Sequence, residues 1–186
     1  NDATGNAGNL TIETGKLTLS NGAAIEANTS GDGNSGNVNL KVEDLFLLRN
    51  NSKVSTTAGS AESSGNGGNI AIDAGLLVGL ENSDITANAF TGRGGLIRIN
   101  TEGIFGLETR PELTPFNDIT AFSQQNPQLD GVVEIVTPDF DPSRGSVQLP
   151  NQPIEAKVVQ ACAPSNDLAQ SEFVVTGRGG LPNTSK

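Results

Sequence analysis

Gly68-Asn69-Ile70-Ala71-Ile72 is the stretch that decides the fold, because close relatives of it recur along the first 135 residues. The other copies occupy residues 8–12, 36–40, 95–99 and 131–135. The third residue of each copy serves as a register mark; the marks are Leu10, Val38, Ile70, Ile97 and Val133, with spacings of 28, 32, 27 and 36 residues. Self-similarity at such periods is typical of solenoid proteins.

Two further apolar segments follow each mark. The second segments centre on Leu17, Leu45, Leu77 and Ile104, and the third on Ile25, Val54, Ile85 and Ile119. Every segment alternates apolar residues with polar or small ones, which is the period of a β-strand. Because each segment is only about three to five residues long, we expect three short strands in each repeat.

A repeat of this size cannot bury its apolar face alone, and stacking on the next repeat solves the problem. Equivalent strands then pair in parallel about 4.8 Å apart, and the inward side chains form continuous columns. The register marks predict one column, and the third segments predict another. The expected fold is therefore all-β, a parallel β-helix (solenoid) over residues 1–135, with right-handed coiling as the usual chirality.

Polar residues also recur in register at the expected corners. Asn9, Asn37 and Asn69 form one set, and Asn28, Thr57 and Asn88 form another. Stacked amides can bond to each other along such a column, although Asn also suits turns for local reasons. Neither interpretation implies a ligand. Residues 30–36 and 59–68 are rich in Gly, Ser and Asn and are expected to be loops leaving one edge.

The composition changes near residue 110. All 9 Pro lie at or after Pro111, whereas 18 of the 23 Gly precede it. Residues 136–186 do not follow the coil period, and terminal units of solenoids are atypical because they cover an open end. We therefore expect a Pro-containing C-terminal capping tail over 136–186, in which 176–181 (Thr-Gly-Arg-Gly-Gly-Leu) repeats residues 91–96.

These motifs resemble a known family, the filamentous-haemagglutinin-like exoproteins of two-partner secretion. The Gly-Asn-apolar coils carry a general likeness, and three ordered tail motifs, at 136–145, 160–162 and 173–182, are similar to the C-terminal end of its cyanobacterial, surface-layer-like members. The resemblance covers essentially the whole chain. It implies a long β-helical shaft, an outer-membrane two-partner-secretion transporter as partner, and a secreted location at the cell surface or associated with the outer membrane. It supplies no catalytic residues.

The net charge and the amino-acid composition argue against several classes of function. The net charge of −10 argues against nucleic acid or an anionic membrane as partner, and no apolar run is long enough to span a membrane. The chain contains no His, which excludes serine triads, Cys-His pairs and His-containing zinc sites within it. The one cysteine, Cys162, is interpreted as a structural or unpaired thiol.

Two carboxylate pairs leave alternatives open. Asp84 and Asp118 precede the third segments of neighbouring coils, and Lys53 holds the same place one coil earlier. The two carboxylates could bind Ca²⁺ or act as an acid/base pair; the simpler interpretation is a solvated face with a Lys53–Asp84 ion pair. Asp139 and Asp141, near Arg144, could hold a cation or form turns and an Asp–Arg contact.

The expected function is a non-enzymatic structural segment of a large secreted cell-surface exoprotein, an adhesin-like stalk. We expect no cofactor and assign no catalytic, cofactor-binding or metal-ligating residue. Cell-surface glycans and other surface proteins are further candidate partners. The alternative is a carbohydrate-active β-helix, lyase-like or hydrolase-like, that uses Asp84 and Asp118. Residue 1 is Asn and no signal peptide is visible, so we expect a fragment whose targeting sequence lies upstream.

Overall fold

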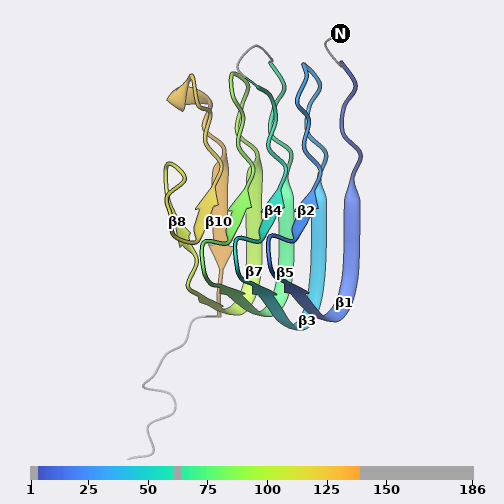
Figure 1. Ribbon diagram of the computed structural model, residues 1–186, viewed down its shortest axis with the longest axis vertical. Coiled ribbons are helices and arrows are strands. Elements are labelled where there is room, and N and C mark those ends of the chain that lie inside the picture. The colour runs from blue at the N-terminus through green and yellow to red at the C-terminus, as the bar shows by residue number, and fades with distance from the viewer. Residues whose placement is uncertain (1–3, 61–63, 139–186) are drawn as a thin grey trace, which may run out of the picture. The chain divides into compact units, whose positions relative to one another are not determined.

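The computed structural model describes residues 4–60 and 64–138. This part of the chain is a β-solenoid built from two parallel sheets, which confirms the predicted fold class (Figure 1). The strands of the first sheet, in order, are β1 (Leu10–Leu19), β3 (Val38–Leu48), β5 (Ile70–Gly79), β7 (Leu96–Phe105) and β10 (Val132–Val136). Those of the second are β2 (Ala24–Glu26), β4 (Lys53–Ser55), β6 (Asp84–Thr86), β9 (Asp118–Thr120) and β8 (Glu108–Thr109). The right-handed coiling stays a prediction.

The predicted apolar columns are confirmed in both sheets. In the first sheet the Cα partners are Leu10 with Val38, Val38 with Ile70, Ile70 with Ile97, and Ile97 with Val133. In the second sheet Ile25, Val54, Ile85 and Ile119 pair in the same successive way. The middle members of both columns are almost completely buried. Stacking like on like therefore builds the core between the two sheets.

The expectation of three short strands per repeat is wrong in one respect. The first two segments of a coil form one continuous strand of 10 or 11 residues, for example β3 and β5. An irregularity interrupts the pairing where Glu43 and Asp44 of β3 lie opposite Gly75 of β5. A bulge of this kind changes which side chains point inward without ending the strand.

Because of this bulge, the second apolar column differs from the prediction in one residue. Phe46 takes the inward place in β3 that was expected for Leu45, pairing with Leu17 on one side and Leu77 on the other. Phe46 is 0% exposed, whereas Leu45 is only half-buried. The extra residue in β3 shifts the alternation by one position, so the spacing of seven residues fails in this coil alone.

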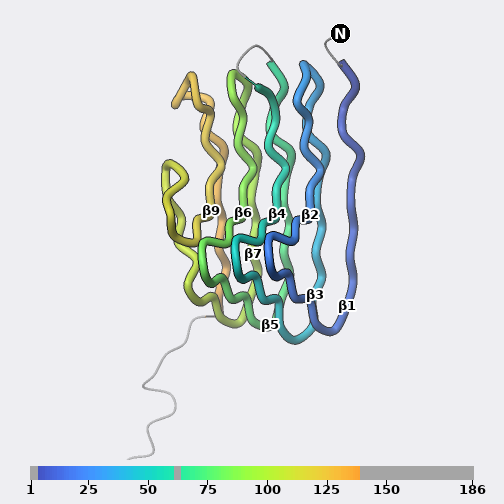
Figure 2. The backbone as a smooth tube through the Cα atoms, viewed as in Figure 1, coloured from blue at the N-terminus to red at the C-terminus, as the bar shows by residue number. Residues whose placement is uncertain are grey.

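The asparagine ladder is confirmed at the corners. The backbone N–H of Asn37 donates to Asn9 Oδ1 at 2.8 Å, and that of Asn69 donates to Asn37 Oδ1 at 2.9 Å. The second set is confirmed in part, since Asn28 Oδ1 accepts from the N–H of Thr57 at 2.8 Å. A further ladder of Asn6, Asn34 and Asn66 was not predicted. It joins Asn34 and Asn66, which belong to two segments expected to be loops; successive coils run side by side in Figure 2.

In the described part of the chain β10 is the last strand of the first sheet, and a short 3-10 helix, η1 (Pro127–Leu129), precedes it. Most of the predicted capping tail lies outside the described residues, and so do Asp139, Asp141, Arg144 and Cys162. Within the described ranges, no helix has the length and apolar character needed to cross a membrane.

Candidate functional site

The candidate carboxylates lie beside an insertion in the fourth coil. The Ile97-to-Ile119 interval is 22 residues, against 15 or 16 in the earlier coils, because the loop at 106–117 is longer than its counterparts in those coils. The loop adds β8 to the second sheet, where Glu108 pairs with Asp118 and Thr109 with Ile119. The insertion thus places new side chains over the outward face of β9.

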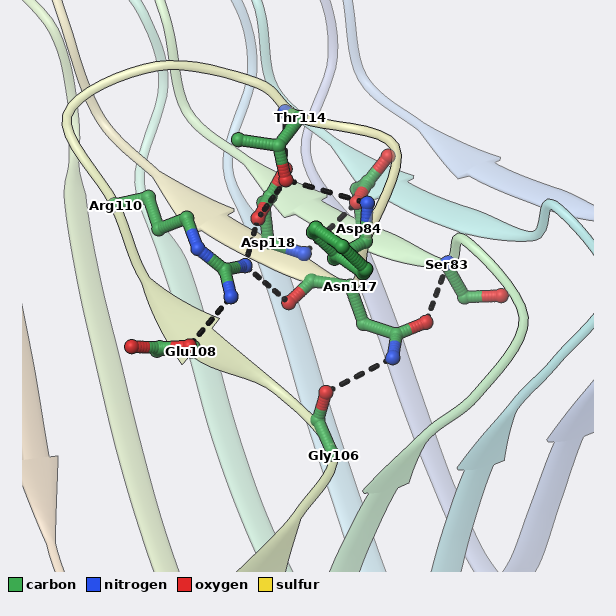
Figure 3. A network of polar contacts seen from close by, with 9 residues as sticks. Ser83, Asp84, Gly106, Glu108, Arg110, Thr114, Asn117 and Asp118 are labelled. Atoms are coloured by element: carbon green, nitrogen blue, oxygen red, sulfur yellow. Dashed lines mark hydrogen bonds and ion pairs between the residues drawn. The ribbon is translucent and has the colours of Figure 1, made fainter.

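The loop covers the Asp118 carboxylate completely. Asp118 is 0% exposed. Its Oδ1 forms an ion pair with the Arg110 guanidinium, which also contacts the Glu108 carboxylate. Thr114 Oγ1 lies 3.0 Å from Asp118 Oδ1 and 2.9 Å from Oδ2, and the Thr114 N–H donates to Oδ2 (Figure 3). Several charge-assisted bonds thus converge on one buried carboxylate.

The neck of the loop is closed by Asn117. Its Nδ2 donates to the carbonyl of Gly106 at 2.9 Å, and its Oδ1 accepts from the N–H of Ser83 in the previous coil at 3.0 Å. Gly106 has a φ of 74°, a left-handed conformation that glycine adopts without strain. Arg110 also lies over the Phe116 ring, 5.6 Å from its centroid. Side chains and backbone together hold the loop against the sheet.

Asp84 stacks on Asp118 but has a different environment. Its Oδ1 accepts from the backbone N–H of Asp118 at 2.9 Å, and the residue is only half-buried. Burial is the main cause that raises the pKa of Asp84 above the ordinary value of 3.8; the hydrogen bond from Asp118 lowers the pKa, and the Asp118 charge raises it. The predicted alignment of the two residues is correct, but the shared solvated face is wrong.

The expected ion pair of Lys53 is also corrected. Lys53 and Asp84 are Cα partners in the sheet, as predicted. The Lys53 ammonium, however, lies 2.6 Å from Glu26 Oε1, in an ion pair that is about half exposed. Exposed pairs of this kind stabilise a protein by at most about 1 kcal/mol. Within the part of the chain that the structure describes, Lys53 therefore leaves Asp84 without an ion-pair partner.

The raised pKa of Asp84 gives a pH-dependent prediction. A carboxyl group that holds its proton more tightly when folded loses stability as the pH rises above its unfolded value. Asp84→Asn removes the charge and keeps the oxygen that accepts from Asp118. We expect the variant to gain free energy of unfolding relative to the wild type as the pH rises from 3.8 toward neutrality. Urea unfolding of both proteins at the two ends of this range measures the difference, and a gain by the wild type would contradict the assignment.

The arrangement of Asp84 and Asp118 does not favour the acid/base catalysis or the Ca²⁺ binding considered for this pair. An acid/base pair needs two carboxylates that reach the substrate, and Asp118 is sequestered by Arg110 and Thr114. The described residues contain no group of three or more Cys, Asp or Glu side chains placed to hold a metal ion. Asp84 alone remains accessible from the outward face.

Sequence reasoning missed the residues that decide this outcome. Arg110, Thr114 and Asn117 belong to a segment that breaks the coil period, so no register argument could place them. The signal that was present is the length of the insertion, together with Arg110 and Thr114, which precede Asp118 by eight and four residues.

No family model matches the chain, and neither a curated protein nor a solved structure matches it.

Proposed function

We propose that this chain is a non-enzymatic structural segment of the shaft of a large secreted cell-surface exoprotein, of the filamentous-haemagglutinin-like type exported by two-partner secretion. The coil and tail motifs favour this family, and a β-solenoid is the architecture that its shafts would need. In a solenoid each coil contacts only the coils next to it, and this arrangement suits an elongated spacer.

The sequestration of Asp118 is the single observation that best supports a non-enzymatic function. The carboxylate is 0% exposed and is bonded to Arg110 and Thr114. Of the candidate pair only Asp84 can meet a ligand, and two-carboxylate hydrolysis requires both partners. All buried side-chain nitrogen and oxygen atoms in the described ranges have hydrogen-bond partners, as is usual in native proteins, so the buried Asp118 carboxylate is fully accommodated by its neighbours.

Surface labelling tests the location and the partner. Antibodies raised against the chain should label intact cells of the source organism, and external protease should remove the label. Disruption of the gene for the cognate outer-membrane transporter should abolish surface labelling. A signal that appears only after permeabilisation would contradict export.

An activity screen tests the non-enzymatic part. The purified chain is incubated with polygalacturonate and alginate, and unsaturated products and new reducing ends are measured. We expect neither to exceed the buffer blank. Activity that Asp84→Asn abolishes would instead support the carbohydrate-active alternative.

A further inference from the structure

Leu113 of the inserted loop borders a groove on the outward face of the second sheet. The groove has a volume of about 360 Å³ and lies between Leu113 of the loop and the coil corner that carries Phe90. Phe122, which follows the loop and β9 in the same coil, also lines the groove. Its volume lies within the range of small-ligand sites, which are concave and carry a few fixed polar groups. The insertion therefore supplies one wall of a groove whose other lining residues belong to the coils.

A chain of hydroxyl groups forms the floor of the groove. Thr86 Oγ1 donates to Ser55 Oγ at 2.9 Å, and Ser55 Oγ donates to Asn28 Oδ1 at 2.8 Å. Thr57 Oγ1 lies 3.2 Å from Thr86 Oγ1. Ser55 and Thr86 are 3% and 7% exposed, so these groups are held in place before any ligand arrives. Connected hydroxyls of this kind polarise one another and present fixed acceptors.

Hydrogen-bond donors and acceptors are both available to a ligand in the groove. Asn28 is exposed, and its Oδ1 accepts from Ser55 and from the N–H of Thr57, which leaves its side-chain amide N–H groups to serve as donors. Thr57 is half-buried and keeps lone pairs that can accept. A ligand that satisfies this face must donate and accept at closely spaced positions, as the hydroxyl groups of a sugar do.

The apolar and charged side chains that line the groove favour one class of ligand. Leu113 is 49% exposed, and Phe90 and Phe122 are partly exposed. Aromatic and aliphatic walls fit the C–H face of a sugar ring. Asp84 and Lys53 both line the groove, but the Lys53 ammonium is paired with Glu26, so the carboxylate of Asp84 disfavours an acidic ligand relative to a neutral one.

We propose that this groove binds a neutral oligosaccharide without cleaving it. The proposal deepens the proposed function by naming a partner class. It rests on that function only for access to the ligand at the cell surface. Binding is measured on purified protein, so a negative result would overturn the groove assignment and leave the surface-labelling result intact.

The test is a titration of the ¹⁵N-labelled 186-residue chain, followed by amide chemical shifts. The probes are cellotetraose, mannotetraose and maltotetraose, with tetragalacturonate as the acidic comparison. We expect saturable shifts at Thr57, Asn88 and Phe122 with at least one neutral sugar and weaker shifts with the acidic one. No saturable shift with any neutral sugar, or a preference for tetragalacturonate, would overturn the proposal.

Variants locate the binding. Leu113→Ala removes one wall, and Thr57→Val removes one accessible hydroxyl; each should raise the Kd about tenfold. Leu76→Ala is the matched control, because Leu76 is 41% exposed and belongs to the first sheet. An equal loss of affinity in the control, or unchanged affinity in both groove variants, would place the binding elsewhere and overturn the assignment.

Discussion

Ile70→Asp is expected to lower the free energy of unfolding by about 4 kcal/mol or more, because it places an unpaired carboxylate in the core. Ile70 is 1% exposed and lies between Val38 and Ile97, which are both 0% exposed. A loss of this size approaches the whole stability of many domains. Urea unfolding followed by circular dichroism measures it.

Ala71→Asp is the matched control for this prediction. Ala71 is the next residue in β5, faces solvent, and pairs with Arg98 across the sheet. The same new charge should change the stability by no more than about 0.5 kcal/mol there. The exposed Glu26→Gln change, which removes the ion pair with Lys53, should also stay near this limit. Equal losses at positions 70 and 71 would refute the assigned register.

Gly68→Ala should destabilise the protein by about 3 kcal/mol or more, although it adds only one methyl group. A Cβ at Gly68 would lie 1.8 Å from the carbonyl oxygen of Gly36 in the previous coil. The next glycine in the column, Gly95, would meet the Gly68 carbonyl oxygen at the same distance. Backbone cannot yield as a flexible side chain does, so the coils would have to separate. Thermal unfolding of the variant tests this.

Gly15→Ala is the control for the glycine column. A Cβ at Gly15 would meet no atom within 4 Å. Replacing such a glycine reduces the entropy of the unfolded chain, so the change should be neutral or stabilising by up to about 1 kcal/mol. If Gly15→Ala and Gly68→Ala cost the same, close backbone stacking would not be the reason for the repeated glycines.

The core columns could be predicted because solenoid stacking places equivalent residues side by side. The repeat identified Val38, Ile70 and Ile97 as stacked neighbours, and alternation identified the segments that carry them as strands. Alternation could not reveal the bulge at Glu43 and Asp44, since a bulge adds a residue while the strand continues. That is why Leu45 was expected in the place that Phe46 holds.

The candidate site was less predictable, because its decisive contacts come from a non-repeating segment. The register placed Asp84 beside Asp118 correctly. Nothing periodic indicated that Arg110 would cover Asp118. Lys53 forms its ion pair with Glu26 and not with Asp84. Which of the two carboxylates it meets depends on side-chain rotamers, which a sequence pattern does not encode.

Through-hydrogen-bond NMR couplings test the central claim, the parallel stacking of successive coils, most directly. In uniformly labelled protein, the amide of Leu10 should couple to the carbonyl of Asn37, and the amide of Val38 to the carbonyl of Asn69, across hydrogen bonds of 2.8 and 2.9 Å. The amide of Ala87 should likewise couple to the carbonyl of Thr120, at 2.8 Å. Couplings that instead join strands of the same coil, such as residues 10–19 with residues 24–26, would show antiparallel hairpins and contradict the solenoid.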